Sequence, residues 1–198
     1  MGQLLTREKI LAKARTVFAR YGFKKASLAD IVRDLGVTKT AIYHHFPGGK
    51  NEIIESVLEA EEVQILEAMR RAVDSEPDPA RKFRQALVAK ASHLRTLRQA
   101  LAVTGEVGEE IRCLYESHER RFKAQERELF EEILREGQRN GLFRDTPRER
   151  LARGIQSAAQ DLISSMVFSD DEDQSERELD QLLDVLFFGI VKRAKSTE

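Results

Sequence analysis

Apolar residues recur every three or four positions along most of the chain, a spacing that predicts helices. After Thr6, the apolar positions of the first such segment are Ile10, Ala14, Val17, Phe18 and Tyr21. Gly22 follows them as a helix stop. Four prolines and few runs of β-branched residues leave no convincing alternating strand. We therefore predict an all-α protein.

Start and stop signals divide the rest of the chain into further helices. Ser27 and Asp30 have the spacing of a capping box, and Asp78–Pro79 supplies a cap with a proline at the first helical position. The predicted helices run from about 50 to 74, 79 to 101 and 109 to 139, and two more open at Thr146–Pro147 and at Ser175. Gly105 and Gly108 are expected to interrupt the chain before the third of these. The acidic segment 169–178 is expected to be a solvated loop.

The segment 27–46 predicts a helix-turn-helix, with helices at 27–35 and 38–46 and a turn at Gly36. Its apolar side would consist of Leu28, Ile31, Val32, Leu35, Val37, Ile42 and Phe46. The opposite face of the second helix would then present Thr38, Lys39, Thr40, Tyr43 and His44. These hydrogen-bonding groups and one aromatic ring suit the base edges and phosphates of a major groove.

Each of these side chains also has a structural explanation. Thr38 suits the N-cap of its helix, a role that is compatible with DNA contact. Lys39 and Thr40, taken alone, would suit a solvated surface, and Tyr43 would suit packing on the helix below. His44 and His45 diverge by roughly 100° on a helix, so they do not share a metal ion easily.

Charge is distributed unevenly along the chain, although the net charge is only −1. Residues 1–50 contain ten Lys or Arg and three Asp or Glu, a net charge of +7. The remaining residues contain 23 basic and 31 acidic side chains, a net charge of −8. This asymmetry favours a polyanion as the partner of the first 50 residues.

Other function classes find little support. We find no nucleophile–base pair, no metal-ligand spacing and no phosphate loop, so we expect neither an enzyme nor a cofactor nor a metal site. A single cysteine, Cys113, excludes an intrachain disulfide. The absence of a long apolar run and of a signal-peptide pattern predicts a cytoplasmic protein without a membrane segment.

The segment of about residues 5–58, which contains the framework A…FA.YGF…S…I…LGV followed by AIYHHF and a lysine, resembles the N-terminal DNA-binding domain of the TetR family of bacterial transcriptional regulators. The FPGGK turn is one residue longer than the family's commonest form. The resemblance implies a helix-turn-helix DNA-binding domain at 1–50, and a larger helical domain at 51–198 for effector binding and dimerisation. It also implies a homodimer on a pseudo-palindromic operator in double-stranded DNA.

The resemblance also assigns roles by position. Thr38, Lys39, Thr40 and His44 would face base edges or the phosphates beside them. Tyr43 and His45 would hold the DNA backbone, with further phosphate contacts from Lys25, Ser27 and Lys50.

The last two helices are the expected dimer interface. The final helix carries an apolar stripe of Leu179, Leu182, Leu183, Leu186, Phe187, Ile190 and Val191. The helix before it carries Ile155, Ala158, Ala159, Leu162 and Met166 among small residues that permit close helix approach. By resemblance these helices would pair with their copies in a four-helix interface, and an ordinary monomer core is the alternative.

A small, largely apolar effector is expected in the helical body. The candidate residues for its pocket are His93, Leu97, Leu114, His118, Phe122 and Leu162. His118 would be a polar group on an apolar stripe, suited either to orienting an effector or to a hydrogen bond with a neighbouring helix. We therefore expect a ligand-responsive dimeric regulator, most simply a repressor. The alternative is a constitutive DNA-binding or architectural protein that has no effector.

Overall fold

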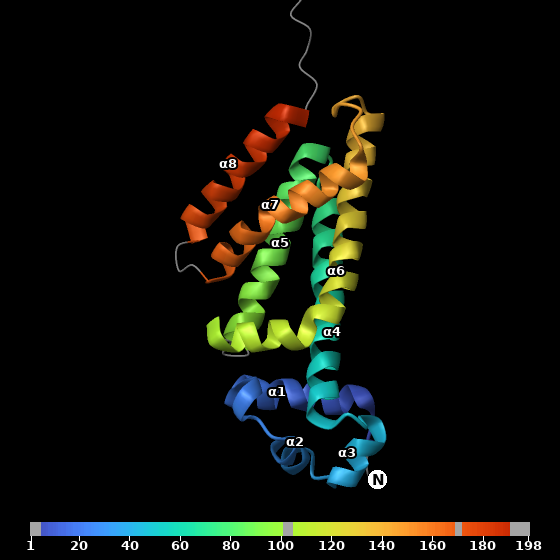
Figure 1. The fold of residues 1–198 in the computed structure, drawn as a ribbon, viewed down its shortest axis with the longest axis vertical. Coiled ribbons are helices and arrows are strands. Elements are labelled where there is room, and N and C mark those ends of the chain that lie inside the picture. The colour runs from blue at the N-terminus through green and yellow to red at the C-terminus, as the bar shows by residue number, and fades with distance from the viewer. Residues whose placement is uncertain (1–4, 101–104, 169–171, 191–198) are drawn as a thin grey trace, which may run out of the picture. The chain divides into compact units, whose positions relative to one another are not determined.

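The computed structural model describes residues 5–100, 105–168 and 172–190, without the side chains of 105–119, 165, 168, 172, 173, 175 and 188–190. The regular elements of these residues are helices, as predicted (Figure 1). They are α1 (Arg7–Lys25), α2 (Leu28–Leu35), α3 (Lys39–His45), α4 (Gly49–Asp74), α5 (Pro79–Ala100), α6 (Gly105–Arg139), α7 (Arg148–Phe168) and α8 (Glu172–Ile190).

The chain forms two compact units. One consists of Met1–Gln64 with Thr96–Glu119, and the other consists of Ile65–Arg95 with Arg120–Glu198. Each unit has its own apolar core. The boundary that we predict at residue 50 separates a DNA-binding domain from an effector-binding domain. It is not the same division as these two compact units, and it stays a prediction.

The core of the first unit lies between α1, α2, α3 and the first turns of α4, and Figure 1 shows these helices gathered around the start of α4. Ile10, Phe18, Ile31, Ile42 and Phe46 are each fully buried there. Leu28, Val32, Leu35 and Val37 pack on this core at partial burial. The apolar side predicted for the helix-turn-helix is therefore confirmed, and it fixes which face of α3 is left outside.

The core of the second unit contains a cluster of aromatic rings. The ring of Phe83 lies 5.4 Å from that of Phe130 and 5.7 Å from that of Phe187, and Phe143 stacks on Phe187 at 5.9 Å. Gly137 leaves room for Phe143, because a Cβ at this position would lie 2.1 Å from the phenylalanine ring. Ring pairs at such distances stabilise a core beyond their area burial.

Polar contacts at partial burial join the helices around that core. The guanidinium of Arg84 on α5 bonds Asp180 at 2.5 Å and Glu176 at 2.9 Å, both on α8. Arg95, also on α5, donates to the Met166 carbonyl near the end of α7 at 2.7 and 3.1 Å. α8 itself packs along α7 (Figure 1).

Three predicted boundaries differ from those in the structure. α1 is kinked at Gly22, whose φ is 73°, but it continues to Lys25. α8 begins at Glu172, so most of the acidic segment expected to be a loop is helical; acidic residues are favoured in the first turn by the helix dipole, and Glu and Gln are good helix formers. α6 begins at Gly105 and continues through Gly108. A single glycine weakens a helix by about 1 kcal/mol, which a helix of 35 residues absorbs. None of the helices in the described part of the chain is long and apolar enough to cross a membrane.

Candidate DNA-binding site

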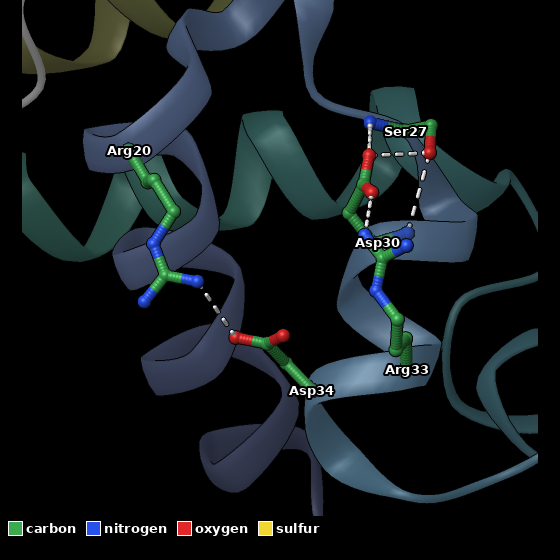
Figure 2. A network of polar contacts seen from close by, with 5 residues as sticks. All are labelled: Arg20, Ser27, Asp30, Arg33 and Asp34. Carbon is green, nitrogen blue, oxygen red and sulfur yellow. Dashed lines mark hydrogen bonds and ion pairs between the residues drawn. The ribbon is translucent and has the colours of Figure 1, made fainter.

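Hydrogen bonds from Ser27 fix the start of α2. The Ser27 backbone N–H and hydroxyl donate to one Asp30 carboxylate oxygen at 2.9 and 2.6 Å, and the Asp30 N–H donates to the Ser27 hydroxyl at 3.2 Å (Figure 2). This is the capping box that the sequence predicts. Arg33, one turn along, pairs with the other Asp30 oxygen. The Ser27 hydrogen bonds, with a smaller contribution from Arg33, hold the pKa of Asp30 below its usual value.

Gly36 makes the turn between the two helices. Its φ of 65° and ψ of 32° are left-handed, and its N–H bonds back to the end of α2. Thr38 then caps α3 by accepting a hydrogen bond from the Ala41 N–H at 3.2 Å. α3 therefore starts at the predicted place, and the Thr38 side chain is itself exposed beside the N-terminus of the helix.

The outer face of α3 has the composition that the sequence predicts. Thr38, Lys39, Thr40 and His44 are exposed, and Tyr43 is 48% exposed although it is aromatic. The opposite face is closed, since Ile42 and Phe46 are fully buried. A short helix thus presents donors, acceptors and one ring on a single side. Such a surface can bond base edges and phosphates of a major groove.

The turn after α3 positions the Tyr43 ring. Gly49 has a φ of 63°, and its N–H donates to the Phe46 carbonyl at 2.9 Å. A Cβ at Gly49 would lie 3.2 Å from the Tyr43 ring, so the ring lies against the glycine backbone. The second glycine of FPGGK therefore permits both a left-handed conformation and close contact with Tyr43.

The remaining predicted phosphate contacts lie at the ends of α1 and α3. Lys25 and Ser27 are exposed, while His45 is half-buried. The half-buried Lys50 donates from its ammonium to the Lys24 carbonyl at 3.3 Å, which places that charge beside the C-terminal end of α1.

A second ionic cluster lies between α1 and α2. Asp34 forms ion pairs with Lys13 at 3.8 Å and with Arg20 at 3.9 Å, and Figure 2 shows the pair with Arg20. Because these basic side chains face an acid of their own chain, they add less to the basic surface than their number in the sequence suggests.

Sequence reasoning missed Arg7 and Glu52, which lie at the C-terminal end of α3. Arg7 on α1 donates to the His45 carbonyl and pairs with Glu52 on α4 at 3.2 Å. The two side chains are 45 positions apart, and no local pattern connects them. A long-range pair of this kind has no signal in a single sequence.

The six residues predicted for an effector pocket have different surroundings. Phe122 is buried in the core of the second unit and Leu162 packs on that core, while His93 is half-buried on α5. Leu97 packs instead on the core of the first unit. The side chains of Leu114 and His118 lie outside the described residues, as does that of Cys113.

A buried polar network beside Phe122 was also missed. Lys90 donates to Glu126 at 2.7 Å, and Gln156 donates to the other Glu126 oxygen at 2.6 Å. The Lys90 ammonium lies 5.4 Å from the centre of the Phe122 ring. The only sequence signal of this network is a charged residue on an otherwise apolar helix face. Among the described residues no group of three or more His, Cys, Asp or Glu is placed to hold a metal ion.

Comparison with known proteins supports the TetR-family resemblance. Residues 10–57 match the family model of the bacterial regulatory proteins of the TetR family. The match covers the helix-turn-helix and the first turns of α4. The TetR-family resemblance and the all-α fold predicted from the sequence are thereby confirmed.

Individual relatives extend the likeness. The HTH-type transcriptional regulator LmrA of Bacillus subtilis (strain 168) is 37% identical over 76 residues, which cover 38% of this chain and 40% of LmrA. The HTH-type transcriptional repressor KstR2 of Mycolicibacterium smegmatis is 26% identical over 140 residues, or 70% of this chain and 67% of KstR2. A transcriptional regulator from Saccharomonospora viridis, solved in complex with choline, has the same fold at a TM-score of 0.65 and 20% identity, covering 94% of this chain and 98% of that one. These relatives are named as regulators and not as enzymes.

Proposed function

We propose that this TetR-family protein is a homodimeric transcriptional regulator that binds a pseudo-palindromic DNA operator. In this proposal it is a cytoplasmic repressor that a small, largely apolar effector releases from the operator. The observation that carries the proposal is the polar outer face of α3, where Thr38, Lys39, Thr40 and Tyr43 stand exposed above a fully buried apolar side. No other role for that face follows from the contacts within the described part of the chain.

The side chains on and around α3 divide into two kinds of contact. The first kind is contact with base edges, made by the N-terminal part of a helix that would enter the major groove. The side chains placed for it on α3 and at its N-cap are Thr38, Lys39, Thr40 and His44. Tyr43 and His45 would hold the DNA backbone, and Lys25, Ser27 and Lys50 would add phosphate contacts. The N-terminus of α3 favours a phosphate for the same electrostatic reason.

The homodimer is proposed from family habit and from apolar surface on the last two helices. Val185 on α8 is 72% exposed, and Gly154 and Ala158 on α7 are exposed small residues. Leu179 and Leu183, which belong to the stripe assigned to the interface, are buried in the core of their own chain. The proposed interface therefore uses the outer side of these helices.

The effector is proposed on the same family basis. A structurally similar regulator is solved with choline bound, and KstR2 is named as a repressor. In this chain Phe122 and Leu162 offer apolar surface in the second unit, next to the charged pair of Lys90 and Glu126. We propose that residues 51–198 bind the effector and dimerise, and that residues 1–50 bind DNA.

Selection of bound duplexes from a random DNA pool, at two salt concentrations, tests the proposal. We expect a two-fold-symmetric motif with half-sites about one helical turn apart, and an affinity that falls steeply with salt. Sedimentation of the protein–DNA complex should give two chains per operator. Binding without an enriched motif would favour the constitutive architectural protein, and no binding at all would refute DNA regulation.

Two substitutions separate the two kinds of contact. Thr40→Ala should relax the selected sequence at one position of each half-site, while Lys25→Ala should weaken all duplexes alike and lower the salt slope by about one for each phosphate that is no longer neutralised. Arg71→Ala is the matched control, because Arg71 is an exposed cation on α4 outside the site and pairs with Glu67 in the same helix. It should change neither measurement.

Release of the operator tests the effector. Compounds that raise the melting temperature of the free protein are added to the operator complex, and the loss of affinity is measured. We expect a coupling of roughly 1–3 kcal/mol, or about 5–150-fold. A compound that binds the protein without changing operator affinity is no effector.

A further inference from the structure

The orientation of α3 is set from outside the helix itself. α3 has seven residues, too few for a helix to be stable alone in water. Its last backbone carbonyls have no partner within the helix, and the chain leaves it at Phe46 in a non-helical conformation. Whatever holds this end therefore decides how the outer face of α3 meets a groove.

Arg7 holds the C-terminal end of α3. Its guanidinium donates to the His45 carbonyl, one of the otherwise unpaired carbonyls of the helix. The same group lies over the Phe46 ring, 4.0 Å from its centre. Phe46 is fully buried, so the ring is a fixed platform for the cation. A positive charge at a helix C-terminus is also favoured by the helix dipole.

Arg7 is in turn held by α4. Glu52 pairs with it at 3.2 Å, and Ser56, one turn later, accepts a hydrogen bond from its second terminal nitrogen at 3.3 Å. The other Glu52 oxygen accepts the Gly48 N–H at 2.9 Å, within the turn between α3 and α4. One carboxylate thus fixes both the arginine and the turn after α3.

We propose that Arg7 is a positioning residue that sets the operator specificity of α3, with Glu52 as its anchor. The inference rests on the proposed function, since it concerns how α3 meets DNA. Arg7 joins three elements at one point: the first turn of α1, the last turn of α3 and the first turns of α4. The competing explanation is that Arg7, which is 45% exposed, is an ordinary phosphate-binding cation.

Glu52 separates these two explanations. On charge alone, Glu52→Gln removes an acid from a DNA-binding surface and should strengthen binding to every duplex. If Glu52 anchors the positioning arginine, the same substitution should weaken binding to the operator. Arg7→Gln should have an effect of the same direction, and the double variant should be no weaker than the weaker single variant because both substitutions remove one interaction.

The experiment measures affinities of Arg7→Gln, Glu52→Gln and the double variant for two duplexes across a salt series. One duplex is the operator selected by the wild-type protein, and the other is the same sequence scrambled. We expect operator affinity to fall about tenfold, comparable to the loss of one bidentate base contact, with the scrambled duplex bound within about twofold of wild type. The salt slope should not change. Lys13→Gln, which removes a charge from α1 at a side chain that faces Asp34, should leave the ratio of the two affinities unchanged.

Three results would overturn the inference. A parallel loss on both duplexes with a salt slope lower by about one makes Arg7 a phosphate contact. Tighter operator binding by Glu52→Gln would show that Glu52 does not anchor Arg7. If Lys13→Gln lowers operator affinity relative to the scrambled duplex as much as Arg7→Gln does, net charge alone explains the loss. If Arg7→Gln fails to fold, Glu52→Gln decides alone. A wild-type protein that selects no operator refutes the proposed function and this inference with it, whereas a selected operator bound equally by all variants refutes the inference alone.

Discussion

The buried pair of Lys90 and Glu126 provides the strongest stability prediction. The side chains are 8% and 1% exposed, and their charged atoms are 2.7 Å apart. Glu126→Leu keeps much of the side-chain volume but removes the carboxylate. The Lys90 ammonium is then left in the core beside the Phe122 ring. Gln156 loses one of its two acceptors at the same time and keeps the Lys123 carbonyl.

The size of the effect follows from the burial. Removing one partner of a buried ion pair leaves an uncompensated charge, which costs about 3–5 kcal/mol. At 2–4 °C per kcal/mol for a chain of this size, the melting temperature should fall by roughly 6–20 °C. The double variant Lys90→Met/Glu126→Leu removes both charges. It should therefore lie within about 2 kcal/mol of wild type, since apolar replacement of a buried pair is often neutral and one Gln156 hydrogen bond is removed.

Urea unfolding followed by far-ultraviolet circular dichroism measures the four members of the cycle. Protein concentration is held constant, because a dimer gains stability with concentration. Lys90→Met alone should also be destabilised, so that the coupling energy between the two positions is large. A loss below about 1 kcal/mol for Glu126→Leu would refute the reasoning, as would a double variant as unstable as the sum of the single variants.

Three further predictions concern the helix ends and the second core. The pKa of Asp30 is depressed in the folded protein, so the stabilising contribution of this carboxylate is present above the unfolded-state pKa and is lost as pH falls through the folded-state value. Ser27→Ala should raise the folded-state pKa, and an NMR titration of the Asp30 carboxyl measures it. Gly36→Ala meets no atom within 4 Å and should lower the free energy of unfolding by roughly 1–2 kcal/mol through left-handed strain alone, measured by urea unfolding. Gly137→Ala places a Cβ 2.1 Å from the Phe143 ring and should destabilise by about 1–3 kcal/mol or more; Phe143→Leu in the same chain should restore part of the lost melting temperature, and equal melting temperatures with and without Gly137→Ala would contradict the close packing.

The helix-turn-helix was predictable because its signals are local. Ser27 and Asp30 are three residues apart, and both hydrogen bonds of their capping box form within that segment. Gly36 lies at the one position between α2 and α3 where a left-handed residue is found. The apolar spacing then assigns Ile42 to the core and Lys39 and Thr40 to the surface. No distant part of the chain is needed for any of these inferences.

Boundaries in the second unit were less predictable because their signals conflict. Acidic residues near 172 match both a solvated loop and a first helical turn, and the structure has the helix. Gly108 matches a helix breaker, but a helix of 35 residues tolerates isolated glycines. Residue preference decides such positions only when packing does not oppose it.

The contacts that sequence reasoning missed are non-local. Arg7 meets His45 and Glu52 across 38 and 45 positions, and Lys90 meets Glu126 across 36. In the sequence Arg7 looks like an ordinary solvated cation, and Lys90 is marked only as a charged residue on an otherwise apolar helix face. Only the fold brings each of them to its carboxylate. The sequence therefore predicts which face of α3 is exposed, but it does not predict the orientation of that face. The orientation of α3 depends on side chains that do not touch the operator in our proposal, so a homologue with the same α3 sequence but no cation at position 7 should prefer a different or less sharply defined operator.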